Sequence, residues 1–198
     1  MLSGIEHVFV VEVAVTSGPK ILVVYYSRTG HTERMARTLA AALHARCEPI
    51  AERGGVAMRR GLWGYLRSLA DVLLNRPVRI LPDGHDLLAY DLVAIGTPVW
   101  AGRAAAPVGS WLRIHAGQLP PVAFFCSMGG RGSESAFATM QAASGKAPLA
   151  TCAVSACAIR HDAHRELLGL FAKRIGAVLA TPAGATARDS ALSGSRAD

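Results

Sequence analysis

The chain has 198 residues, of which 51% are hydrophobic and 18% charged, so it can bury the core of one globular domain and is not of a disordered composition. Its formal net charge is +7, which suits an acidic partner, an anionic substrate or a membrane surface, although a solvated basic face explains it equally well. No apolar run is long enough to span a bilayer, and we expect no nucleic-acid partner.

The first 19 residues are expected to form an extension ahead of the domain. They are apolar but carry Glu6 and Glu12, and they lack the basic leader and small-residue cleavage site of a signal peptide. A short strand at 8–15 and a mis-assigned start are two interpretations that stay open. The regular pattern begins only at Lys20.

From residue 20 to 180, apolar runs alternate with helical patterns. The continuous apolar run at 21–26 predicts a strand buried on both faces, and further strands are expected at 47–50, 92–97, 122–127 and 148–155. Helices are expected at 32–45, 58–75, 105–116 and 133–144, and from a cap at Asp162 to 179, with Ser133 capping the fourth of them. This alternation predicts an α/β fold with a five-stranded parallel sheet and helices on both faces. Residues 181–198 are expected to form a disordered tail.

The four cysteines show neither a CxxC pair nor the spacing of a metal site. They are Cys47, Cys126, Cys152 and Cys157. We therefore expect free thiols, no metal and a cytoplasmic location, where thiols stay reduced. A phosphatase loop is a weak alternative, because it needs five residues between Cys and Arg and only four separate Cys126 from Arg131.

The first expected strand ends in small hydroxyl residues just where a helix begins. This segment reads Ser27-Arg28-Thr29-Gly30-His31-Thr32. The unpaired N–H groups at a helix start bind phosphate, Gly30 allows close approach of the backbone, and hydroxyls donate to phosphate oxygens. No Lys follows Gly30, so this is not a nucleoside-triphosphate loop. The alternative is an ordinary helix cap made by Thr29 or Thr32.

Two further strand ends carry residues suited to a planar ligand. Thr97-Pro98-Val99-Trp100-Ala101-Gly102 presents a tryptophan in a loop, where it can stack on a flat ring, unless it packs against a neighbouring helix. Ser127-Met128-Gly129-Gly130-Arg131-Gly132 presents three glycines whose backbone amides can reach the ring's polar edge, unless they are only a flexible helix entry. In a parallel sheet such strand ends meet at one edge.

With these three segments in this order, the chain from about Lys20 to Leu179 resembles the flavodoxin-like family. The matching pieces are VVYYSRTGHT, IGTPVWAG and FFCSMGGRG. The resemblance implies a three-layer sandwich with strand order 2-1-3-4-5 and FMN at the switch between the first and third strands. It implies that the FMN phosphate is held by Ser27, Thr29, Gly30, His31 and Thr32, with Arg28 either in solvent or adding to the phosphate field. It further implies that Pro98, Val99, Trp100, Ala101 and Gly102 line the isoalloxazine ring, and that Ser127, Met128, Gly129 and Gly130 contact its pyrimidine side.

The resemblance implies an oxidoreductase in which the flavin carries the chemistry and no catalytic side chain is identified. The family contains FMN-dependent NAD(P)H:quinone oxidoreductases, which often form oligomers, so NAD(P)H is the candidate donor and a homo-oligomer is an expectation. The alternative is a non-enzymatic electron carrier that serves a redox partner protein. Carrier flavodoxins are typically acidic, whereas this chain has a pI near 9.7. Three roles stay open for the basic, amphipathic segment at 59–79. It is expected to pack its leucines on the sheet, to cover the flavin edge, or to contact a partner or a membrane.

Overall fold

Strands and helices alternate through the residues that the computed structural model describes, which are 18–52, 78–81, 84 and 86–181. The strands are β1 (Ile21–Tyr25), β2 (Arg46–Pro49), β3 (Leu92–Trp100), β4 (Arg103–Ala104), β5 (Val122–Met128) and β6 (Thr151–Ser155). The helices are α1 (His31–Leu43), α3 (Ala106–His115), α4 (Ser133–Ser144), α5 (Ala156–Arg160) and α6 (His164–Ala180). Two short 3-10 helices, η2 (Leu87–Ala89) and η3 (Ala116–Gln118), lie among them.

Five of the strands form a parallel sheet in the order β2-β1-β3-β5-β6. This confirms the predicted α/β fold and strand order, with β5 and β6 as the fourth and fifth strands. The sequence did not predict β4, a short strand that pairs antiparallel with the end of β3. It forms because Ala101 and Gly102 both take positive φ angles, 48° and 73°, and turn the chain back on itself.

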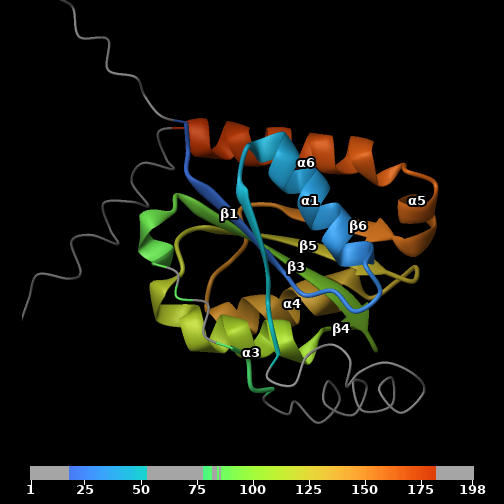
Figure 1. The fold of residues 1–198 in the computed structure, drawn as a ribbon, viewed down its shortest axis with the longest axis horizontal. Helices are drawn as coiled ribbons and strands as arrows, with labels where there is room; N and C mark the ends of the chain where they lie inside the picture. The colour runs from blue at the N-terminus through green and yellow to red at the C-terminus, as the bar shows by residue number, and fades with distance from the viewer. Residues whose placement is uncertain (1–17, 53–77, 82–83, 85, 182–198) are drawn as a thin grey trace, which may run out of the picture.

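Helices cover both faces of the sheet, α1 and α6 on one side and α3 and α4 on the other (Figure 1). The side chains of β1 alternate between the two hydrophobic cores, one on each face of the sheet. Ile21, Val23 and Tyr25 join the core under α1 and α6, whereas Leu22, Val24 and the following Tyr26 join the other. Every residue of β1 is buried, as expected for a strand covered on both faces.

Several boundaries and caps differ from the sequence-based expectation. β3 continues to Trp100, where the hairpin begins, rather than ending at Thr97. β6 begins at Thr151 rather than at Pro148, and α5 was not predicted. Neither α4 nor α6 has a side-chain cap, so the expected caps by Ser133 and Asp162 are wrong. Asp162 instead has a φ of 59° and its carboxylate pairs with Arg34 of α1 at 2.7 Å, a long-range contact that sequence alone does not reveal.

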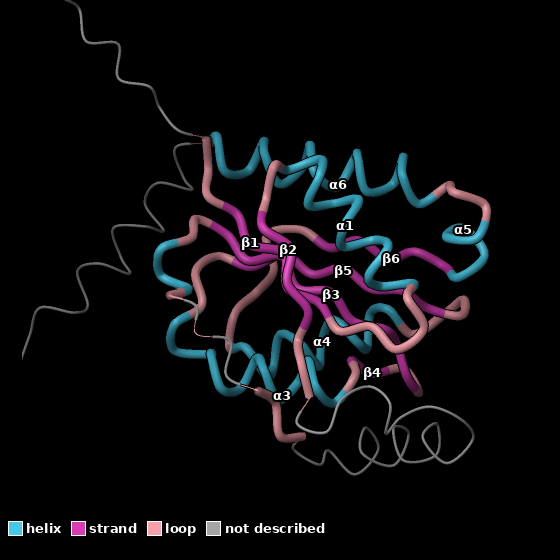
Figure 2. Tube along the Cα trace, in the orientation of Figure 1, coloured by secondary structure: helices cyan, strands magenta, loops and turns pink. Residues whose placement is uncertain are grey.

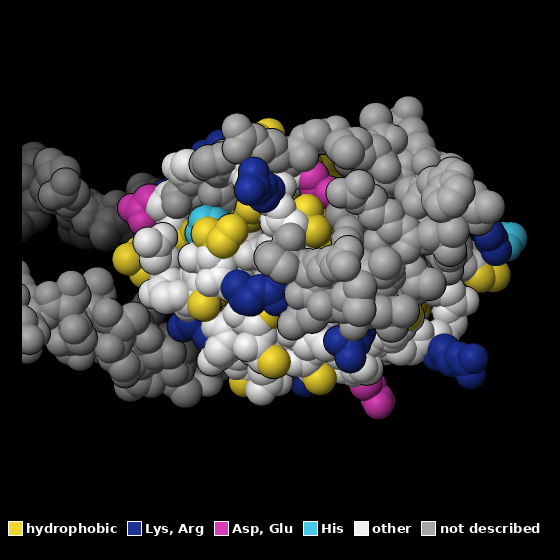
Figure 3. Space-filling model, turned by 90° about the horizontal axis from the view of Figure 1, so that it is seen from below, with side chains coloured by type: hydrophobic (Ala, Val, Ile, Leu, Met, Phe, Trp, Pro, Cys, Tyr) yellow, Lys and Arg dark blue, Asp and Glu magenta, His cyan; other side chains and the backbone are white. Residues whose placement is uncertain are grey.

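Parts of the expected organisation lie outside the described residues. These are the N-terminal extension up to residue 17, the expected helix at 58–75 and the tail from 182. Within the described part of the chain, no helix combines the length and the apolar character needed to cross a membrane. On the side seen in Figure 3, the visible Lys and Arg side chains are scattered singly among apolar ones.

Candidate functional site

The three segments singled out in the sequence lie at one edge of the sheet. β1 pairs with β3, and β3 with β5, all in parallel, so their carboxyl ends point the same way. The segments that follow are the first loop (26–30), the β3–β4 hairpin turn (100–103) and the third loop (129–132) (Figure 2). The fold therefore assembles all three segments into one candidate site, at the place where parallel α/β sheets bind ligands.

The first loop presents backbone donors at the start of α1. Gly30 precedes the helix with a φ of 87°, a conformation that favours glycine, and its N–H donates to the Ser27 hydroxyl at 3.1 Å. Thr29 and Gly30 are exposed. No side chain caps α1, so the alternative of a Thr29 or Thr32 cap is wrong. The N–H groups of the first turn have no partner within the helix and carry partial positive charge, which suits an anion.

A buried hydroxyl pair joins the first loop to the third. The side chains of Thr32 and Ser127, 95 positions apart in sequence, share a hydrogen bond of 2.8 Å. Both residues are buried, Thr32 almost completely. Each hydroxyl has one hydrogen and only one is used between them, so the other can donate to a ligand. The two residues thus lie together, although the resemblance assigned Thr32 to the phosphate and Ser127 to the pyrimidine side of the ring.

Trp100 lies at the end of β3 on a two-residue turn. It pairs with Arg103 across the hairpin, and its ring is half-buried against the core on the α3 side. The Tyr26 ring meets it edge-on, with centroids 5.8 Å apart and an interplanar angle of 89°. Trp100 therefore combines a partial core role with an exposed part that can stack on a flat ring.

The third loop packs closely against the hairpin. A Cβ placed on Gly132 would come within 2.9 Å of the Gly102 Cα and 3.3 Å of a Val99 methyl. Gly132 also has a φ of 96°. Any side chain here would separate the two segments, so Gly132 sets the distance between them. Gly129 and Gly130 are exposed, and a Cβ at either position would meet nothing within 4 Å, which leaves their backbone accessible to a ligand.

Arg28 adds positive charge to the site and does not point simply to solvent. It is half-buried, and the carbon of its guanidinium lies 5.4 Å from the centre of the Trp100 ring. This is within the range of a cation–π contact. Arg28 therefore bridges the first loop and the hairpin.

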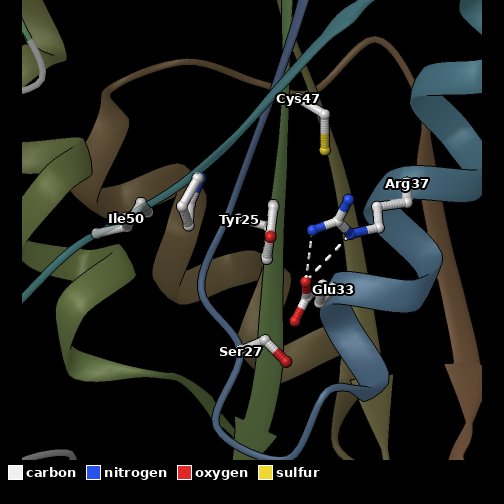
Figure 4. A pocket seen from close by; sticks show the side chains of 7 residues that line it. Tyr25, Ser27, Glu33, Arg37, Cys47 and Ile50 are labelled. Carbon is white, nitrogen blue, oxygen red and sulfur yellow. Dashed lines mark hydrogen bonds and ion pairs between the residues drawn. The ribbon is translucent and has the colours of Figure 1, made fainter. Parts of the chain in front are cut away.

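A cleft of about 360 Å³ opens on the other side of β1 (Figure 4). It is lined by Tyr25, Ser27, Glu33, Arg37, Cys47, Pro49 and Ile50. Arg37 donates to the Glu33 carboxylate at 2.9 Å, and burial raises the pKa of the Cys47 thiol. Tyr25 points toward α1 whereas Tyr26 points toward Trp100, because neighbouring strand residues face opposite sides. The cleft is thus separate from the Trp100 ring and shares only Ser27 with the site.

Cys126 does not have the properties of a nucleophile. It is fully buried in β5, and burial raises its pKa to about 12. Only the thiolate is strongly nucleophilic, so this thiol is inert near neutral pH. All four cysteines are free thiols.

The sequence analysis missed two residues of the candidate site, Tyr26 and Gly132, and one contact of a residue that it did name, Arg28. Tyr26 was read only as strand, although the alternation of strand side chains places it on the Trp100 side. Gly132 was read only as part of a glycine-rich entry, and the contact of Arg28 with Trp100 was not expected. No local signal identifies these last two, because both depend on how distant segments meet.

No protein-family model matches the chain, and no curated protein matches it either. Solved structures do. A flavoprotein from Lactobacillus acidophilus NCFM, in complex with FMN, is 22% identical with a TM-score of 0.61, covering 69% of this chain and 93% of its own. A protein described as a flavoprotein, from Bacteroides uniformis ATCC 8492, is 18% identical with a TM-score of 0.62, covering 79% and 99%. A WrbA-like flavodoxin from Agrobacterium tumefaciens is 16% identical with a TM-score of 0.53, covering 81% and 97%. These similarities establish the fold of this chain.

Proposed function

We propose that this chain, which has the flavodoxin-like fold, binds FMN at the carboxyl edge of its sheet and acts as an FMN-dependent oxidoreductase. The observation that carries the proposal is the meeting of three elements: the open start of α1, the half-buried Trp100 ring and the buried Thr32–Ser127 hydroxyl pair. An anion site next to an aromatic surface fits a ligand with a phosphate at one end and a flat ring at the other. The FMN complex of the Lactobacillus acidophilus flavoprotein supports the same choice of ligand.

At the phosphate end, the first loop would hold FMN. The exposed Thr29 hydroxyl and the backbone N–H groups of His31 and Thr32 are donors of the right kind for a terminal phosphate, and Gly30 has no side chain to hinder its approach. The Gly30 N–H is already given to Ser27, which leaves the Ser27 O–H free to donate to an anion. Within this part of the first loop Arg28 adds a cation, which a dianionic phosphate favours.

At the ring end, the hairpin and the third loop would enclose the isoalloxazine. Pro98, Val99 and Trp100 are half-buried, and Ala101 and Gly102 complete the turn beside them. Pro98 of β3 pairs with Ser127 of β5, so residues 128–130 follow at the same edge of the sheet, where their amides would meet the polar edge of the ring. The close contact at Gly132 holds the two sides together.

FMN, when bound, would supply the redox chemistry by accepting a hydride equivalent and passing electrons to an acceptor. We propose NAD(P)H as the donor and a quinone as the acceptor. The protein's part is to hold the ring and exclude water from one face of it. The free state of all four thiols supports the further proposal that the chain works in the reducing cytoplasm.

The test is a visible absorption spectrum of the chain reconstituted with FMN, followed by anaerobic titration with NADPH. We expect flavin bands that bleach on NADPH addition and return when a quinone is added. Retained bands that NADPH leaves unchanged would favour the electron carrier that serves a protein partner. Absence of FMN binding would refute the proposal. Light scattering on the same sample decides between a monomer and a homo-oligomer.

A further inference from the structure

We propose that Arg28 is a movable side chain that competes with the flavin ring for Trp100 and turns to the FMN phosphate when the ring stacks, so that it selects FMN over riboflavin. This inference rests on the proposed function and adds to it the means by which the site distinguishes the two flavins. It starts from one contact, the Arg28 guanidinium over the Trp100 ring at 5.4 Å.

The guanidinium and a flavin ring need the same surface of Trp100. One part of the Trp100 ring packs against the core on the α3 side, and the Tyr26 ring makes a T-shaped contact with it. The remaining exposed surface is where a planar ligand can stack. The Arg28 side chain is charged, so it lies on that outer surface rather than on the core side. A ring that stacks on Trp100 must therefore displace the guanidinium.

The first loop offers the displaced side chain a second partner. Arg28 lies between Ser27 and Thr29, in the loop whose backbone donors lead into α1. A phosphate held by that loop lies within reach of its long side chain. The planar guanidinium suits both partners, because it stacks on aromatic faces and also binds phosphate oxygens in bidentate fashion.

The two flavins then differ in the contact that they offer to the displaced Arg28 side chain. Riboflavin displaces the guanidinium and offers no phosphate, so its affinity is lowered by the loss of the cation–π contact. FMN displaces it and provides an anion in exchange. Competition for Trp100 affects both ligands equally and cancels in the ratio of their Kd values, so the riboflavin Kd reports the competition and the ratio reports the phosphate contact.

The experiment measures the Kd of FMN and of riboflavin by calorimetry for the full chain and for Arg28→Ala. We expect riboflavin to bind about two- to fivefold more tightly to the variant, the fold-change that an exposed cation–π contact represents. We expect the preference for FMN over riboflavin to fall by about tenfold, which corresponds to one hydrogen bond to a charged group.

Two further variants separate this effect from charge and from folding. Arg174→Ala removes an equal charge from an exposed position on α6, outside the three segments of the site, and should leave riboflavin binding unchanged. Arg28→Lys keeps the charge but stacks less well, so it should retain most of the FMN preference while riboflavin binds more tightly.

Unchanged or weaker riboflavin binding in Arg28→Ala would overturn the inference, because it would show that Arg28 only holds Trp100 in place. An unchanged ratio of the two Kd values would also overturn it, because Arg28 would then not turn to the phosphate. These results are distinct from failure of the proposed function, in which the unaltered chain itself binds neither flavin.

Discussion

Trp100, at the end of β3, is held by two residues that follow β1. Tyr26, after β1, meets its ring edge-on, and the guanidinium of Arg28 lies over its face. The turn beneath it needs positive φ at both central positions, which Gly102 adopts easily and Ala101 adopts at some cost. The ring is thus positioned before any ligand stacks on it, which reduces the entropy lost on binding.

Replacement of Trp100 by Ala should weaken FMN binding by about 1 kcal/mol or more, because it removes the stacking surface. Riboflavin should lose a similar amount, since both ligands carry the same ring. The control is Trp100→Phe, which retains an aromatic face and should lose less. Fluorescence titration of both flavins measures the effect, and an FMN affinity equal to that of the unaltered chain would refute the stacking assignment.

The Thr32–Ser127 pair makes a second residue-scale prediction, on stability. Thr32→Val or Ser127→Ala alone leaves the partner hydroxyl buried without its bond, at a cost of about 1–3 kcal/mol. The double variant should cost clearly less than the sum, because neither hydroxyl is then left unpaired. Urea unfolding of the three variants measures the coupling free energy between the two hydroxyls. Additive losses would mean that water or another group replaces the lost partner.

At the scale of elements, the site depends on how the β3–β4 hairpin meets the loop before α4. The hairpin is also tied to α4 by the Thr139 hydroxyl, which accepts from the Ala104 N–H at 3.3 Å. Thr97 accepts from the Ala105 N–H at 2.9 Å and so fixes the entry to α3. Through these bonds and the contact at Gly132, β3, α3 and α4 together position the part of the candidate site proposed to hold the ring.

Gly132→Ala should therefore destabilise the fold by about 1–3 kcal/mol, because its φ of 96° is strained for alanine and its Cβ would meet the Gly102 backbone. Gly129→Ala is the matched control in the same loop, since a Cβ there meets nothing within 4 Å and its φ is not positive. Urea unfolding of both variants measures the difference. Equal stability of the two would contradict the close packing of hairpin and loop.

Across the whole molecule, polar contacts join α1 to α5 and to the turn before α6. Arg34 of α1 donates to the Ile159 carbonyl at 3.3 Å and to the Asp162 carboxylate at 2.7 Å. His164 lies beside them, fully buried, and neither of its ring nitrogens has a hydrogen-bond partner among the described residues. Burial, and then the charge of Arg34, lower the pKa of His164, although Asp162 partly opposes this.

This lowered pKa predicts a loss of stability in mild acid. Below a pH of about 6.5, the unfolded chain takes up a proton on this imidazole more readily than the folded chain does, so unfolding is favoured as the pH falls. His164→Leu should reduce that slope, measured by urea unfolding between about pH 7.5 and 5.5. The control His161→Leu removes an exposed imidazole from the same α5–α6 junction. A slope that His164→Leu leaves unaltered would assign the pH dependence to other groups.

Patterns in the sequence were enough to predict the class of fold and the three segments of the candidate site, and the resemblance implied the strand order. The fold class and the three segments can be predicted from local patterns. Continuous apolar runs indicate buried strands, and hydroxyl or glycine residues mark the ends of those strands. The folded structure was needed to show that Thr32 bonds Ser127, that Gly132 packs against Gly102 and that Arg28 lies on Trp100. It also replaced the expected Asp162 cap with an ion pair to Arg34. These contacts join residues far apart in the chain, so they depend on strand register and helix placement, which no local pattern specifies.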